Sequence, residues 1–221
     1  MRAIAVDIKG NLDAFLSRRS PAARYASFDY CFNYFQDARD AQETAGLASG
    51  DLLEVSCLHL GFYLASWGMM RGGLRGRSLQ ELVPVVQAIA DEPPASWELD
   101  VPGYSEGGIA AVLALGDRIG SAYTFAASSV LVTKTMLGVF GCIPAFDRFF
   151  RLGFGDTALD HATLTDISDF YMANKSALNT MPVRTLDFTT GQDTPRCYTH
   201  AKIIDMVFFQ EGYKQTGKVR R

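Results

Sequence analysis

The sequence predicts an all-α globular protein, and two observations support this fold class. Apolar residues recur at three- and four-residue steps, as Tyr25, Phe28, Phe32 and Phe35 do, which places them on one face of a helix. Hydrophobic residues make up 48% of the 221 residues and aromatic residues 12%, enough to fill a packed interior. We therefore expect a compact helical bundle.

The N-terminal half of the chain predicts four helices. They cover residues 11–18, 24–39, 50–70 and 78–92. Ser20 and Pro21 end the first helix, and the third is apolar enough to lie at the centre of the fold. Ser78 opens the fourth helix with Glu81 three residues later, which is the pattern of a capping box. Pro84 is expected to kink this fourth helix.

A connector with three prolines, residues 92–106, separates this half from the rest. Helical patterns follow at about 107–120, 122–140 and 144–152, from Thr163 or Thr165 to about 179, and at 198–213. The stretch 181–196 is irregular and holds one extended patch. We expect one functional unit over residues 1–221, a two-lobed bundle. The lobes would be about 1–91 and 107–221, and the alternative assigns the N-terminal segment to the second lobe.

Composition argues against membrane and secreted classes of protein. Arg71, Lys134 and glycines interrupt the longest apolar runs, so none reaches membrane-spanning length. The first residues, MRAIAVDIKGNLD, lack the apolar core and cleavage site of a secretory signal, and we expect a cytoplasmic protein. The net charge of −3 counts against an extended non-specific nucleic-acid binder, but it allows one basic face on an acidic body.

No metal or cofactor site is predicted. The cysteines are far apart and form no Cys-x-x-Cys pair, which excludes a zinc ribbon and an iron–sulfur cluster. We expect buried free thiols at Cys31, Cys57, Cys142 and Cys197. The three histidines, His59, His161 and His200, show no metal-ligand spacing either.

The chemistry is expected in residues 127–151. An apolar helix that carries one lysine, Lys134, leads to Gly141 and Pro144 and then to a single acid, Asp147. Apolar residues precede this acid and two phenylalanines follow shortly after it. A carboxylate in such surroundings is costly to bury unless it is paired or has a function.

The order of an apolar helix, Gly141, Pro144, Asp147 and Arg151 resembles the catalytic segment of the helix-hairpin-helix DNA glycosylases. The resemblance implies a two-lobed, all-α DNA N-glycosylase that flips a base out of double-stranded DNA without a cofactor. It also implies a damaged or modified base as the substrate. Certain divergent members of this superfamily act on glucosylated hydroxymethylcytosine in phage DNA, so phage defence stands beside repair as an expectation.

The chain departs from the family pattern in two places. The usual Leu-Pro-Gly-hydrophobic-Gly hairpin is absent, and residues 123–129, which take its place, contain no glycine. The family's lysine nucleophile would fall near Ser128 or Ser129, whereas Lys134 lies only thirteen residues before Asp147. We therefore expect a monofunctional enzyme without lyase activity.

Two kinds of role are open for the candidate catalytic residues Asp147 and Lys134. The Asp147 carboxylate would stabilise positive charge on a sugar or activate water, or else it would cap the following helix or pair with Arg151. Lys134 would act as a Schiff-base nucleophile or a phosphate contact, or else it would pair with an acid or extend to the surface.

The remaining candidates are contacts to DNA. A basic loop interrupted by glycines supplies three predicted phosphate contacts, Arg71, Arg75 and Arg77. Arg148 and Arg151, further along the chain, are the other two. The predicted base pocket consists of Trp67, Asn33 and Phe149. Trp67 would stack on a base or wedge into the duplex, and Asn33 would hydrogen-bond a base edge, whereas core packing is the alternative for Trp67.

Two other functional classes compete with the enzyme. A non-catalytic helical interaction module, of the antitoxin or immunity type, predicts no affinity for DNA and a solvent-exposed Asp147. A helical ribonuclease toxin usually needs an arginine and a histidine separated by four to six residues, and Arg196 and His200 are one residue too close.

Overall fold

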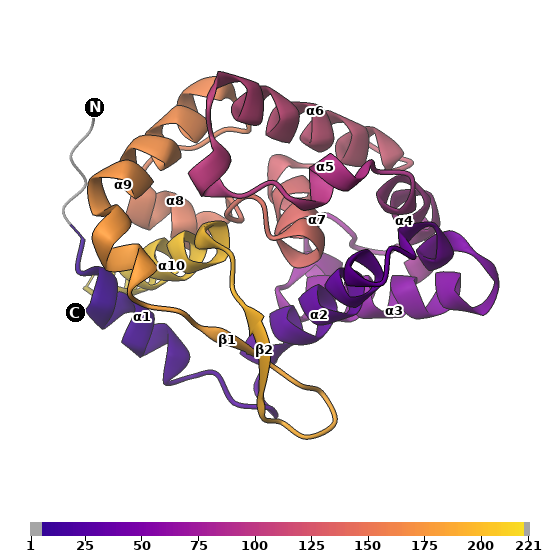
Figure 1. The fold of residues 1–221 in the computed structure, drawn as a ribbon, viewed down its shortest axis with the longest axis horizontal. Helices are drawn as coiled ribbons and strands as arrows, with labels where there is room; N and C mark the ends of the chain where they lie inside the picture. The colour runs from indigo at the N-terminus through magenta and orange to yellow at the C-terminus, as the bar shows by residue number, and fades with distance from the viewer. Residues whose placement is uncertain (1–5, 219–221) are drawn as a thin grey trace.

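The computed structural model describes residues 6–218, and over this range the chain is all-α with one small two-stranded sheet, as the sequence predicts. The helices are α1 (Ile8–Leu16), α2 (Ser27–Asp40), α3 (Gly50–Ser66), α4 (Val83–Ala90), α5 (Pro94–Trp97), α6 (Glu106–Ala122), α7 (Ser129–Phe140), α8 (Arg148–Phe154), α9 (His161–Asn179) and α10 (His200–Lys218). Strands β1 (Arg184–Leu186) and β2 (Asp193–Cys197) pair antiparallel (Figure 1).

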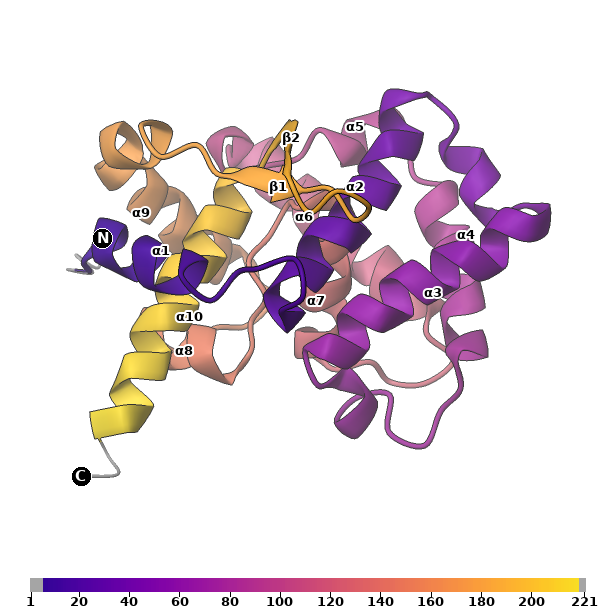
Figure 2. The ribbon, with the colours of Figure 1, turned by 90° about the horizontal axis from the view of Figure 1, so that it is seen from below.

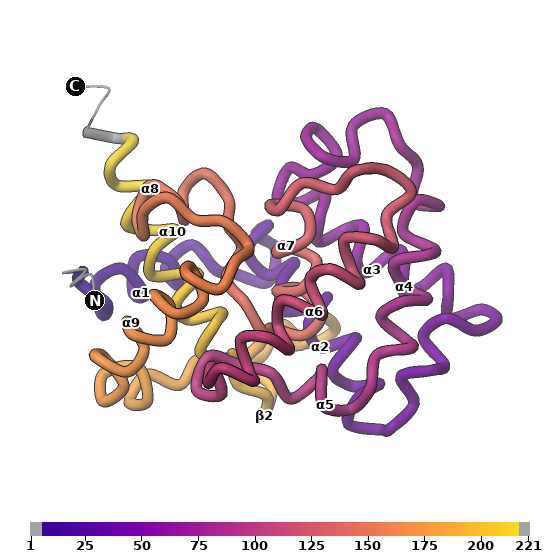
Figure 3. Tube along the Cα trace, turned by 90° about the horizontal axis from the view of Figure 1, so that it is seen from above, coloured from indigo at the N-terminus to yellow at the C-terminus, as the bar shows by residue number. Residues whose placement is uncertain are grey.

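The helices gather in two groups around α7. Helices α1, α8, α9 and α10 lie at one end of the molecule, and α2, α3 and α4 lie at the other (Figure 2). Seen from above, α6 lies between the groups, in contact with α9, α7 and α4 (Figure 3). Helix α1 packs on α10, so the N-terminal segment joins the C-terminal helices. One main cluster of buried apolar side chains includes residues of both groups.

Two glycines let α8 and α10 approach at backbone distance. An ideal Cβ on Gly212 would lie 1.9 Å from the carbonyl oxygen of Phe149, and one on Gly153 would lie 2.2 Å from that of Phe208. Neither space can hold a methyl group, because the opposing atoms belong to helical backbone. This contact fixes α8, and with it the residue that precedes α8, against α10.

The structure corrects several local expectations. Glu81 does not complete a capping box; its carboxylate accepts hydrogen bonds from Arg77 and Thr124. The predicted helix 78–92 begins as a 3₁₀ turn at Leu79–Leu82, and Pro84 falls in the first turn of α4, where its missing N–H costs nothing and no kink follows. Asp160, rather than either threonine, caps α9.

The connector 92–106 is packed rather than extended. It contains α5 and a 3₁₀ turn at Val101–Gly103, and it buries Trp97 and Tyr104. Cys31, Cys57 and Cys142 are buried free thiols as expected, but Cys197 lies on β2 and is exposed.

None of the helices within residues 6–218 is both long and apolar enough to span a bilayer. The same residues contain no group of three or more histidine, cysteine, aspartate or glutamate side chains arranged to hold a metal ion.

The Gly212 contact yields a test of the fold. Gly212→Ala should lower the free energy of unfolding by about 2 kcal/mol, because the added methyl group overlaps the backbone of α8. Gly107→Ala in α6 is the matched control, since a Cβ there meets no atom within 4 Å, and it should stabilise by up to about 1 kcal/mol. Chemical denaturation of both variants measures the difference, and equal effects would contradict the described packing.

Candidate nucleic-acid interface

A buried segment between α7 and α8, residues 141–147, forms the framework of the candidate site. Helix α7 ends at Gly141, whose φ of +67° is the left-handed conformation that glycine adopts without strain. The Gly141 carbonyl accepts a hydrogen bond from the Thr199 hydroxyl at 2.6 Å, and the Cys142 carbonyl accepts one from the Tyr104 hydroxyl at 2.6 Å. Buried backbone groups outside regular structure need such partners.

The second half of this segment is held by side chains of α7 and α10. The backbone N–H of Ala145 donates to Asp205 Oδ1 at 3.1 Å, and that of Phe146 donates to Thr133 Oγ1 at 3.0 Å. Thr133 lies on α7 and Asp205 on α10, so two helices fix the approach of the chain to Asp147.

Asp147 stands at the start of α8 and accepts three hydrogen bonds. Its Oδ1 caps the helix by accepting from the N–H groups of Phe149 and Phe150, at 2.9 and 3.1 Å. Its Oδ2 accepts from Lys134 Nζ at 2.9 Å, and the Lys134 side chain is only 4% exposed. A carboxylate offers about four lone-pair positions. One acceptor position therefore remains, and the Asp147 side chain is 16% exposed.

The structural roles expected of these two residues are confirmed in part. Asp147 caps α8, and Lys134 pairs with an acid, namely Asp147 itself. The expected ion pair between Asp147 and Arg151 does not form. The Arg151 guanidinium instead donates to Ser129 Oγ at 3.2 Å, in the first turn of α7.

A second buried ion pair lies near the first. Lys202 Nζ and Asp205 Oδ2 are 2.8 Å apart on α10, and both side chains are buried. Three cations approach the ring of Trp67: Lys134 Nζ at 5.2 Å, Lys202 Nζ at 5.7 Å and the Arg24 guanidinium carbon at 5.4 Å from its centroid. Sequence reasoning assigned no function to Lys202, Asp205 or Arg24, although two charged residues three apart in an apolar helix were a usable signal.

Asp29 of α2 is a further buried acid near the Lys134–Asp147 and Lys202–Asp205 ion pairs. Its Oδ1 accepts from the Tyr198 hydroxyl at 2.6 Å and lies 3.5 Å from Arg19 Nη1. Burial raises the pKa of the Asp29 carboxyl to about 6, against the opposing effects of its hydrogen bond from Tyr198 and the charges of Arg19 and Lys202. The three acids Asp29, Asp147 and Asp205 and the three cations Arg19, Lys134 and Lys202 thus form one group of largely buried charges.

Two of the three predicted base-pocket residues lie at this region. Trp67 makes edge-on contacts with Tyr25 and Phe209, and Phe149 packs against Phe209 and Tyr213. The surrounding rings and cations hold Trp67 as a half-buried wall of the site, so it does not project as a wedge. Its indole Nε1 is buried and meets no hydrogen-bond acceptor among the described residues.

The structure does not bring Asn33 to this region. Its side-chain amide donates to the Leu186 carbonyl, and its oxygen accepts from Arg196, so it ties α2 to the β-hairpin. The Trp67 contacts involve residues near the start of α2, whereas Asn33 lies in the second half of that helix. Its hydrogen bonds are already used within the fold.

The basic loop lies beside the connection between α6 and α7. A Cβ on Gly73 would be 3.3 Å from the Leu131 side chain, and the Arg77 guanidinium lies 3.8 Å from the centroid of the Phe125 ring. Arg77 also pairs with Glu81, so it is not free for phosphate. The basic loop and the α6–α7 connection therefore lie side by side. This connection, residues 123–129, stands where the family's hairpin is expected.

Four of the five predicted phosphate contacts have no acid partner. Among residues 6–218, no salt bridge engages Arg71, Arg75, Arg148 or Arg151. Arg71, Arg75 and Arg148 are exposed, and Arg151 is half-buried beside the start of α7. These cations are available to an anion.

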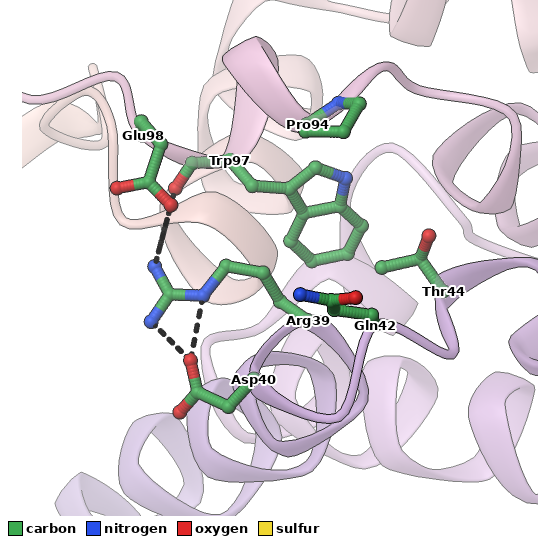
Figure 4. A pocket seen from close by; sticks show the side chains of 7 residues that line it. All are labelled: Arg39, Asp40, Gln42, Thr44, Pro94, Trp97 and Glu98. Atoms are coloured by element: carbon green, nitrogen blue, oxygen red, sulfur yellow. Dashed lines mark hydrogen bonds and ion pairs between the residues drawn. The ribbon is translucent and has the colours of Figure 1, made fainter.

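A separate cavity of about 530 Å³ opens near the C-terminal end of α2 (Figure 4). Arg39 and Trp97 line it together with Asp40 and Glu98. The Arg39 guanidinium already binds Asp40 Oδ1 and lies 3.6 Å from Glu98 Oε1, so its charge is balanced within the cavity. This cavity does not suit a phosphate group.

The Asp29 environment yields a pH prediction. A carboxyl whose pKa is raised to about 6 in the folded protein binds more protons than in the unfolded chain, where its pKa is about 3.9. Its contribution to stability is present below pH 4 and is lost as the pH rises to about 6. The difference in unfolding free energy between the native chain and Asp29→Asn should shift by about 2–3 kcal/mol over that window. Urea titrations at pH 4, 5, 6 and 7 measure it, and parallel pH curves would contradict the burial of a titrating Asp29.

Comparisons with known proteins identify no relative of this chain. No protein-family profile, no curated protein and no solved structure matches this chain. The geometry of the Lys134–Asp147 pair and of the arginines around it therefore has to carry the functional conclusion.

Proposed function

We propose that this protein is a monofunctional DNA N-glycosylase in which Asp147 acts at the sugar of an extruded nucleotide. The observation that carries the proposal is the state of the Asp147 carboxylate. Three donors fix it, one acceptor position stays open, 16% of the side chain is exposed, and Arg148 and Arg151, which have no acid partner among the described residues, follow it on α8.

The chemistry follows from the charge that develops during base release. As the N-glycosidic bond breaks, its electron pair leaves with the base and positive charge builds on the sugar. A preorganised carboxylate in a partly buried site stabilises that cation and can also orient the attacking water. Because Asp147 cannot turn away from its two backbone donors, it needs no reorganisation when the charge appears.

Lys134 is a positioning residue in this proposal. Its ammonium donates to Asp147 Oδ2 at 2.9 Å, and this charge-assisted hydrogen bond holds that oxygen in place. A Schiff base would require the Lys134 amine to reach the sugar, whereas its nitrogen is bound to Asp147 and its side chain is only 4% exposed. The pairing therefore supports base excision without lyase activity.

DNA is the proposed partner, and a damaged or modified base is the proposed substrate. Arg71, Arg75 and Arg148 present charge to the phosphates, and Trp67 offers an aromatic wall with an unsatisfied indole N–H next to Lys134. Glucosylated hydroxymethylcytosine of phage DNA belongs in the substrate panel beside deaminated, oxidised and alkylated bases.

Base release from such a panel tests the proposal. Asp147→Asn should reduce the rate on the active substrate by at least about 100-fold, because the amide keeps the helix cap but loses the negative charge. Asp160→Asn, which alters the equivalent cap of α9, should leave the rate unchanged. Borohydride should trap no covalent complex with DNA.

Two results would contradict this proposal. Equal base release by the native chain and Asp147→Asn would remove Asp147 from the chemistry. A borohydride-trapped complex that disappears in Lys134→Gln would make Lys134 the nucleophile and the enzyme bifunctional.

A second candidate function is a helical interaction module, and one observation favours it. The outer face of α3 exposes four large apolar side chains within residues 52–62, namely Leu52, Val55, Leu58 and Phe62, with Phe62 57% exposed. Exposed apolar stripes of this kind often mark protein contacts. This module would have no affinity for DNA, whereas phosphate contacts impose a steep salt dependence on binding.

A further inference from the structure

The arginines of this protein divide into two classes by their partners. Among residues 6–218, five arginines lie within salt-bridge distance of an acid: Arg19, Arg39, Arg77, Arg118 and Arg196. Seven have no such partner among the described residues: Arg18, Arg24, Arg71, Arg75, Arg148, Arg151 and Arg184. An acidic protein has enough carboxylates to pair these cations, so their distribution in space is informative.

Six of the seven unpaired arginines lie in three segments that border the Lys134–Asp147 pair. Arg71 and Arg75 lie in the loop after α3, and Arg148 and Arg151 lie on α8. The other two, Arg18 and Arg24, lie in the loop between α1 and α2, residues 17–26. Figure 2 shows this loop between α10 and α3, on the side from which the molecule is viewed.

Arg18 and Arg24 are exposed and rest on aromatic rings. The guanidinium carbon of Arg18 lies 4.5 Å from the ring centroid of Tyr213, which in turn contacts Phe149 two residues after Asp147. That of Arg24 lies 5.4 Å from the centroid of Trp67, the ring that Lys134 also approaches. Stacking orders a guanidinium without neutralising its charge, so its N–H groups remain free for an anion.

The loop that carries them is held firmly from inside. Arg19, between the two exposed arginines, turns inward and donates to the Tyr198 hydroxyl at 2.8 Å and the Arg184 carbonyl at 2.6 Å. It also lies 3.5 Å from Asp29. One buried arginine thus anchors the loop while its neighbours face solvent.

We infer that Arg18 and Arg24 form a further phosphate-binding rim, so that a DNA backbone contacts the α1–α2 loop as well as the arginine loop and α8. The inference deepens the proposed function and rests on it for the identity of the nucleic acid. Planar, stacked guanidinium groups suit the phosphodiester group, and the neighbouring Tyr213 and Trp67 rings suit the sugar and base that follow it.

The salt dependence of DNA binding tests this rim directly. Binding of an unmodified duplex is measured between 50 and 300 mM salt in an Asp147→Asn background, so that no turnover interferes. Each lost phosphate contact lowers the slope of log K against log salt by about 0.9. The Arg18→Ala, Arg24→Ala double variant should therefore lose about 1.8 from the slope, whereas Arg18→Lys, Arg24→Lys should retain it.

Arg184→Ala is the matched control, because Arg184 is exposed and has no acid partner among the described residues. Its backbone carbonyl accepts from Arg19, but its guanidinium donates to the Thr194 carbonyl of β2 and so belongs to the β-hairpin. It should leave the slope unchanged. An unchanged slope in the double alanine variant, an equal loss in the control, or no binding of DNA by any form would overturn the inference.

The test separates the rim from the proposed function. A slope that falls as expected, in a protein that releases no base from any substrate, would support a DNA-binding rim and contradict the glycosylase. Base release that depends on Asp147, with a slope that ignores Arg18 and Arg24, would support the glycosylase and contradict the rim.

Discussion

The buried segment between α7 and α8 is the constraint on which the rest of the structure depends. Residues 141–146 are all buried although they form neither helix nor strand. Their backbone groups cannot reach water, and an unpaired buried N–H or carbonyl costs about 1–3 kcal/mol. Four side chains supply the partners: Thr133 of α7, Tyr104 of the connector before α6, Thr199 just before α10, and Asp205 of α10.

The same constraint explains why charged residues lie in the interior. Asp205 needs Lys202 because a carboxylate that accepts from a buried N–H still carries a charge, and Asp147 needs Lys134 for the same reason. These requirements account for the two ion pairs as structure. They do not account for the open acceptor position of Asp147 or for the six unpaired arginines around it, and those features are the ones that the proposed chemistry uses.

The sequence allowed the fold class to be predicted because the helical period of apolar residues is strong. It also placed Asp147 at a helix start, since an aspartate before an amphipathic turn is a common cap. The pairing of Lys134 with Asp147 could not be predicted, because it depends on how the thirteen residues between them fold back. The prediction that Asn33 lines the base pocket was wrong for a similar reason. Periodicity places Asn33 on α2, but only tertiary contacts show that its side chain hydrogen-bonds to the β-hairpin. Arg24 gave no sequence signal, since its contact with Trp67 joins residues far apart in the chain.

The central claim is that the fixed Asp147 carboxylate stabilises a cationic sugar held in DNA. The most direct measurement compares the affinities of two duplexes, one with a positively charged pyrrolidine in place of a sugar and one with a neutral tetrahydrofuran at the same position. The native chain should bind the charged duplex at least about tenfold more tightly, and Asp147→Asn should bind both equally. Equal affinities in the native chain, or a preference that survives in Asp147→Asn, would contradict the claim.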